Sequence, residues 1–126
     1  MTIREIIDTY SAMRKPPLDT HVLLRIISGM ERRIIDEILS RCEGGEITFT
    51  GYKPSDLGRE CLAKSPYDMI YVWACCHKTD LRDGAVNAAN NSLSLQEDIL
   101  KKFGNYWIRE HAPKGAKNIS DRLHNV

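Results

Sequence analysis

The fold is decided by residues 65–76, which read SPYDMIYVWACC. Ser65 followed by Pro66 and an acid is typical of a helix start, because the Ser hydroxyl can cap free amides and Pro fits the first turn. The residues that follow are apolar on nearly all sides, and such a helix needs neighbours on several sides. We therefore predict a buried central helix from Ser65 to Leu81, with the Trp73 side chain in the core.

Two further helices are predicted upstream of this central helix. Residues 2–5 read TIRE, a capping box in which Thr and Glu satisfy each other's backbone amides, and a pair of prolines ends the helix that it opens. A longer helix begins after Asp19 and ends at a pair of glycines. Its buried stripe comprises Leu23, Ile27, Met30, Ile34 and Ile38. The side chains predicted to face water comprise Glu31, Arg32, Arg33, Asp36 and Glu37.

The last predicted helix runs from Ala85 to His111. Its apolar stripe comprises Ala89, Leu93, Leu100, Phe103 and Trp107. Residues 87–94 read NAANNSLS, and Asn and Ser are poor residues for a helix interior. Such residues can serve a hydrogen bond, a close approach between helices or a contact outside the subunit, so Asn90 and Asn91 are candidate interface residues. The alternative is a plain polar stretch that faces solvent.

One segment has the pattern of a β-strand. Residues 46–50 read EITFT, which alternates polar with apolar residues and is rich in β-branched and aromatic side chains. Residues 51–58 supply turn chemistry, and residues 59–63 are a weaker candidate for the return strand. The predicted fold is therefore mainly α, a bundle of about four helices with a short two-stranded β-hairpin. We assign residues 1–112 to a single helical domain and residues 113–126 to a flexible C-terminal tail.

Composition places the chain among ordinary globular proteins. Of its 126 residues, 42% are hydrophobic and 28% are charged, which argues against wholesale disorder. The formal net charge is +1, so no bulk field draws the chain to nucleic acid or to an anionic membrane. The apolar runs are too short to span a bilayer, and we expect no membrane partner.

We predict no enzymatic activity and no catalytic, cofactor-binding or metal site. The sequence has no phosphate-binding glycine loop and no metalloprotease or serine-hydrolase motif. Asp68 is expected to cap a helix and Asp80 to lie on the surface. The four cysteines, expected to be free and mostly buried thiols, are Cys42, Cys61, Cys75 and Cys76. A zinc site that combines Cys75 or Cys76 with His77 would lack a second ligand pair.

The order of several motifs resembles that of a known family. The motifs are EGG at 43–45, ITFTGY at 47–52, SPYDMIY at 65–71, NNS at 90–92, FGNYWIREH at 103–111 and PKG at 113–115. Over about residues 1–118, the chain resembles the small head–tail connector proteins, or head-completion adaptors, of tailed bacteriophages and of prophages of gut Firmicutes. It departs from the family at residues 74–77, where members often carry bulky residues and Gln, and at Ala89, where they often carry Tyr.

The resemblance implies a non-enzymatic structural protein of the virion. Such an adaptor forms a ring below the portal protein and joins the head to the tail. Its implied partners are the portal protein, tail-completion proteins and further copies of itself, while the free protein can stay monomeric. Packaged DNA would pass through the ring without sequence-specific binding, which suits the near-neutral charge. The implied location is the head–tail junction of the virion, and the host cytoplasm during assembly.

Other functions stay open at this point. The chain could be a tail-completion protein or an assembly chaperone of the same phage neighbourhood. A regulatory DNA-binding domain would need a basic recognition helix, and none is obvious. In the predicted tail, Lys114, Lys117 and Arg122 give a modest positive excess over Asp121, so they are candidate interface residues toward an acidic partner or DNA. The alternative is a plain disordered end with no role in assembly.

Overall fold

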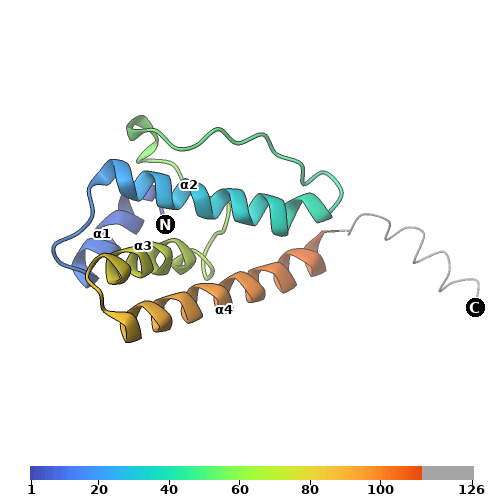
Figure 1. Cartoon of the computed structure of the whole chain (residues 1–126). Coiled ribbons are helices and arrows are strands. Elements are labelled where there is room, and N and C mark those ends of the chain that lie inside the picture. Colours follow the sequence, from blue (N-terminus) through green and yellow to red (C-terminus); the bar gives the residue numbers. More distant parts are fainter. Residues whose placement is uncertain (112–126) are drawn as a thin grey trace, which may run out of the picture.

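The computed structural model describes residues 1–111, so the predicted tail lies outside the described residues. Within that part, the α-helices are α1 (Ile3–Met13), α2 (Thr20–Glu37), α3 (Met69–Arg82) and α4 (Val86–Glu110) (Figure 1). The short 3-10 helix η1 (Leu39–Arg41) follows α2, and η2 (Pro54–Asp56) lies in the loop before α3. The prediction of a mainly helical fold is confirmed.

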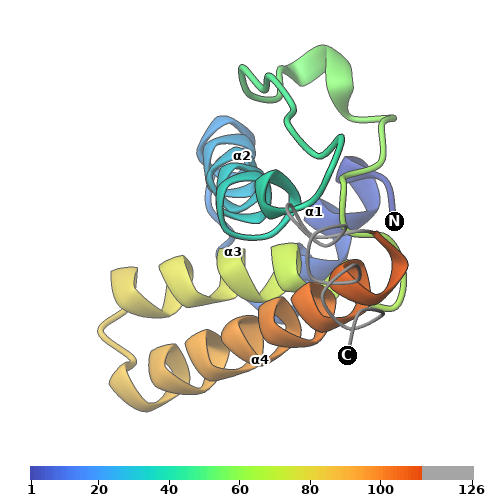
Figure 2. The same cartoon turned by 90° about the vertical axis from the view of Figure 1, so that its right-hand side faces the viewer.

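The helices are arranged around α3. α3 and α4 lie side by side and antiparallel, joined by a short turn, while α1 and α2 both pack on α3 (Figures 1 and 2). After α2, the chain turns and a long loop runs back along the outside of that helix (Figure 1). α3 therefore has helical neighbours on several sides, as its all-round apolar sequence requires.

The apolar stripe predicted for the α2 segment is confirmed, although α2 ends at Glu37, before Ile38 and before the pair of glycines predicted to end it. Its five members, Leu23, Ile27, Met30, Ile34 and Ile38, are all buried. A helix with 3.6 residues per turn places positions three and four apart on one side, which here is the side that faces the core. Burial of each large aliphatic side chain is worth about 1.5–3 kcal/mol, so this stripe contributes strongly to the packing of α2.

α3 is the buried helix that the sequence predicts, but it begins at Met69 and not at Ser65. The preceding residues form turns, and Asp68 stands at the cap position without a capping hydrogen bond from its side chain. Its carboxyl group instead accepts a hydrogen bond from the amino group of Met1 at 2.6 Å. A charged amine is a stronger partner for a carboxylate than a backbone amide, so the predicted side-chain cap is not formed.

Trp73 is only partly buried, which corrects its predicted place in the core. Side chains four residues apart share one face of a helix. Trp73 therefore shares its face with His77 and Leu81, and Leu81 is 54% exposed. The positions of α3 that are buried in the core comprise Ile70, Tyr71, Val72, Ala74, Cys75 and Cys76.

The predicted β-hairpin is wrong for the described residues. Residues 46–50 are irregular, and the antiparallel bridge that forms joins Thr2 to Glu60. The first amides of a helix have no partner within it. The first two amides of α1 donate to the carbonyl oxygens of Arg59 (2.8 Å) and Leu57 (2.9 Å), so the start of α1 is bound by the first residue of the candidate return strand and by the turn before it.

Candidate interaction site

Glu31 is buried, which overturns its predicted place on the wet side of α2. Its side chain is 0% exposed, and its carboxyl group accepts three hydrogen bonds. The donors are the hydroxyl of Tyr52 (2.5 Å), the hydroxyl of Tyr71 and the backbone amide of Leu62 (2.9 Å). These donors come from the loop after α2, from α3 and from the segment before α3. One carboxyl group thus joins three parts of the chain to α2.

The groups around Glu31 are held in their neutral forms. Burial, followed by the hydrogen bond to Glu31, raises the pKa of Tyr52 well above its usual range, and burial does the same to the pKa of Tyr71. Burial and the nearby Glu31 raise the pKa of Cys61 to about 12. Because the thiolate is the reactive form of cysteine, Cys61 is a packing residue at neutral pH.

Asp80 is buried as well, against the prediction of a surface position. It is 3% exposed, and one of its oxygens accepts from Arg14 Nε at 2.7 Å. Its other oxygen accepts from the Arg14 guanidinium at 3.2 Å and from the Ser92 hydroxyl at 2.7 Å. Arg14 follows α1, Asp80 lies in α3 and Ser92 in α4. The cluster therefore ties three helices together with a forked, charge-assisted contact.

Acid should weaken the Asp80 cluster. Burial raises the pKa of Asp80, but the hydrogen bonds from Arg14 and Ser92 outweigh burial and hold that pKa below its ordinary value. A depressed pKa means that the stabilisation is present above the ordinary Asp pKa of about 3.9 and is lost as the pH falls toward the folded-state value.

We expect Asp80→Asn to lower stability at pH 7 and to flatten the loss of stability between about pH 5 and pH 2. Urea titrations at each pH would measure this. Asp8→Asn, at an exposed position of α1, is the matched control. In this variant the loss of stability between about pH 5 and pH 2 should be the same as in the native chain. The prediction would be contradicted if the free energy of unfolding fell as steeply with decreasing pH in Asp80→Asn as in the native chain.

The spacing of the sequence held a signal for both buried acids. Glu31 stands four residues after Ile27 and four before Ile35, and Asp80 stands four after Cys76. Residues four apart share a helix face, so both acids fall on faces that are otherwise apolar. Their buried partners account for both, and the surface is where a contact with another molecule must be sought.

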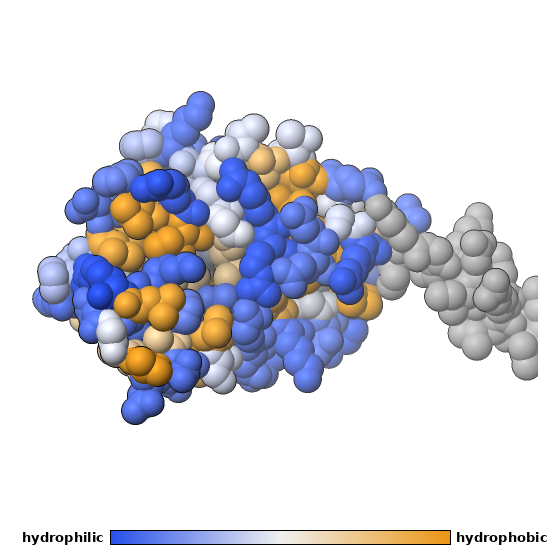
Figure 3. Space-filling model, viewed as in Figure 1, coloured by the Kyte–Doolittle hydropathy of each residue, from blue (hydrophilic) through white to orange (hydrophobic). Residues whose placement is uncertain are grey.

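A groove opens on one face of the bundle, between α2, α3 and α4. Its volume is about 650 Å³, within the range of roughly 300–1,000 Å³ that is usual for binding clefts. The apolar wall comes from Val22 and Ile26 of α2 and from Leu93 of α4. Figure 3 shows apolar residues gathered over the N-terminal half of α2 on this face. We refer below to this feature as the groove.

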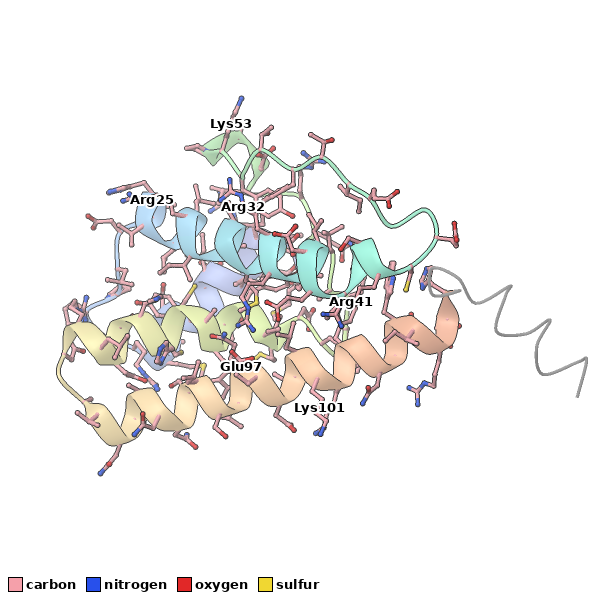
Figure 4. The ribbon with its side chains drawn as sticks, turned by 45° about the vertical axis from the view of Figure 1, so that its right-hand side comes forward. Arg25, Arg32, Arg41, Lys53, Glu97 and Lys101 are labelled. Carbon is pink, nitrogen blue, oxygen red and sulfur yellow. The ribbon has the colours of Figure 1, made fainter. Side chains whose placement is uncertain are left out.

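The rim of the groove is mostly basic. Arg25 of α2 and Lys78 of α3 are exposed, and neither forms an ion pair within residues 1–111. Arg33 donates to Glu37 at 2.6 Å and to Glu97 at 2.7 Å, which links α2 to α4. Arg25 and Glu97 lie on the two helices that flank the groove (Figure 4). The unpaired positive charge therefore lies on Arg25 and Lys78.

The structure describes only some of the candidate interface residues. Asn90 and Asn91 are exposed on α4, while the adjacent Ser92 is buried in the Asp80 cluster. The polar run that the sequence singles out thus contains one residue with an internal structural role. Lys114, Lys117 and Arg122 lie outside the described residues.

In residues 1–111, no three or more His, Cys, Asp or Glu side chains are grouped to hold a metal ion. Cys75 and Cys76 are fully buried. Nδ1 of His77 lies 2.8 Å from the carbonyl oxygen of Ala89, in the helix beside α3. The described part therefore offers no geometry for the zinc site weighed from the sequence.

Comparison of the chain with protein-family models, with curated proteins and with solved structures found no match. Among residues 1–111, no helix has the length and apolar character needed to cross a membrane. The fold and the site define a small, mainly helical protein with an open groove on one face.

Proposed function

We propose that this protein is a non-enzymatic head–tail connector of a tailed bacteriophage or prophage, which forms a ring below the portal protein and joins the head to the tail. The observation that carries the proposal is the spread of exposed, large apolar side chains over separate places on the bundle. They are Ile47, Leu81, Val86, Leu93 and Ile108. One lies in the loop after α2, two flank the α3–α4 turn, one lines the groove and one lies near the end of α4.

A ring subunit needs several different contact areas. In a ring, one patch of each copy meets a different patch of its neighbour, and a connector also contacts the components above and below it. Single exposed apolar residues are ordinary on any surface. Here one of them lines a groove of about 650 Å³, which gives a neighbour a concave place to bind. The net charge of +1 suits a ring through which DNA slides.

The motifs behind the family resemblance support the same proposal. The stretch from Asn90 to His111 lies on α4 and its end, and residues 65–68 lead directly into α3. α3 and α4 are the pair that pack together most extensively. The resemblance therefore covers the helices that organise the bundle.

The test is removal of the gene from an inducible prophage that encodes it, followed by electron microscopy of the particles. We expect DNA-filled heads and separate tails that do not join, with joining restored by the gene supplied in trans. Normal tailed particles would contradict the proposal. Absence of the protein from finished virions would favour an assembly chaperone, and its presence on purified tails a tail-completion protein.

A further inference from the structure

We propose that copies of this chain join head to tail, with residues 43–47 of one copy seated in the groove of the next. We call these residues, which read EGGEI, the acidic loop. Ile47 would lie on the apolar wall, between Val22 and Leu93 of the neighbour. The inference rests on the proposed ring-forming function and names the contact that would build the ring.

The chemistry of the two surfaces is complementary. The acidic loop carries the exposed Glu43 and no basic residue, and Ile47 in the same loop is 42% exposed. The groove offers an apolar wall with Arg25 and Lys78 at its rim. Apolar anchors in a pocket supply most of the binding energy of an interface, and opposite charges at its rim set the orientation.

The acidic loop lies beyond the C-terminal end of α2, away from the apolar wall of the groove. On α2 the groove runs from Val22 to Arg33, but Val22, Arg25 and Ile26 lie in the first half of the helix, and the acidic loop follows its C-terminal end (Figure 1). The helix rises about 16 Å between Ile26 and its end at Glu37, and none of residues 43–47 lines the groove of the same copy. Apolar areas near both ends of α2 are separated by hydrophilic residues in Figure 3.

A contact between two different patches has a consequence for assembly. Each dimer leaves one groove and one acidic loop unoccupied, so further copies can add until the rotation between subunits closes a ring. A second copy is therefore the occupant that fits both the charge and the placement of the two surfaces.

The acidic loop is a formed structural feature. Gly44 has a φ of 73°, which favours glycine, and a Cβ on Gly45 would collide with the carbonyl oxygen of Leu39. The turn is therefore packed closely on the residues after α2. A loop that is already shaped loses little freedom on binding, which lowers the cost of the contact.

Disulfide trapping tests the contact directly. Ile26→Cys and Ile47→Cys would be made in separate full-length chains, mixed and oxidised at high protein concentration. The four native cysteines are all buried, so they leave the background low. We expect about tenfold more 26–47 disulfide than the 8–47 disulfide formed with an Asp8→Cys control on α1. Both cysteines in one chain should give a ladder of dimers, trimers and higher species.

Charge exchange gives a second, independent readout. Arg25→Glu in one chain, or Glu43→Lys in the other, should each cut the yield of the 26–47 disulfide about tenfold. Mixing the two altered chains should restore it, because the charges are again opposite. Circular dichroism melting of each variant checks that it folds.

The outcomes separate this inference from the proposed function. Equal yields of the 26–47 and 8–47 disulfides, or a mixture dominated by 26–26 and 47–47 pairs, would overturn the head-to-tail contact. If gene removal shows that the protein is a connector but its rings do not form the 26–47 disulfide, the proposed function stands and the proposed interface is wrong. If the 26–47 disulfide forms a ladder of oligomers but heads and tails join without the gene, the proposed interface stands and the proposed function is wrong.

Discussion

Glu31→Ala should lower the free energy of unfolding by about 3–5 kcal/mol. The substitution removes the acceptor for the Tyr52 and Tyr71 hydroxyls and for the Leu62 amide. Each buried donor that loses its partner costs about 1–3 kcal/mol, and the lost side chain leaves a cavity in addition. Urea titration monitored by circular dichroism would measure the change.

Two further variants separate the hydrogen bonds of Glu31 from general damage to α2. Glu31→Gln keeps the size and one acceptor oxygen, so it should cost less, about 1–2 kcal/mol. Asp36→Ala changes an exposed acid of the same helix and should stay within about 0.5 kcal/mol of the native chain. If Glu31→Ala costs no more than Asp36→Ala, Glu31 does not hold the three segments together.

Phe103→Ala should cost a comparable amount, about 3–5 kcal/mol, because it empties a fully packed site in the core. Phe103 on α4 is 2% exposed, and its ring lies 5.5 Å from that of Tyr67 and 5.8 Å from that of Trp107, centroid to centroid. Aromatic pairs at such distances add to the value of burial alone. Urea titration of the variant gives the free energy.

Trp73→Ala is the informative comparison for Phe103→Ala. The sequence predicts a cost of about 3–5 kcal/mol for Trp73, on the assumption that the ring is in the core. Because Trp73 lies on the outward face of α3 and is only partly buried, we expect a smaller loss of about 1–2 kcal/mol. A larger cost for Trp73→Ala than for Phe103→Ala would show that the central packing has been assigned to the wrong face.

The positions of the helices were predictable because their signals are local. The capping box at residues 2–5 forms as the sequence indicates: the Glu5 amide donates to the Thr2 hydroxyl, and the Glu5 carboxyl accepts from the Thr2 amide. The spacing of Leu23, Ile27 and Ile34 identified the buried side of α2 for the same reason. A helix is stabilised by bonds and contacts between residues three and four apart, so a short window of sequence contains most of the information.

The location of the groove could not be read from the sequence, because its walls come from three helices. Val22 and Leu93 are 71 positions apart in the chain and line one groove only because α2 and α4 both pack on α3. The prediction of a β-hairpin with a return strand was wrong for a related reason. The alternating pattern of residues 46–50 is compatible with pairing, but the free amides at the start of α1 donate to the carbonyl oxygens of Leu57 and Arg59.

By itself, then, the sequence determined that this chain is a helical protein, where its long helices run and which apolar stripes they bury. Only the tertiary structure decided which of its polar side chains are buried and which are exposed. Glu31 can be buried because the hydroxyl of Tyr71, 40 residues away in the sequence, donates a hydrogen bond to it. Asp80 can be buried because the guanidinium of Arg14, 66 residues away, pairs with it. Burying an acid is unfavourable unless partners meet it in the folded state, and no local pattern reveals whether such partners arrive.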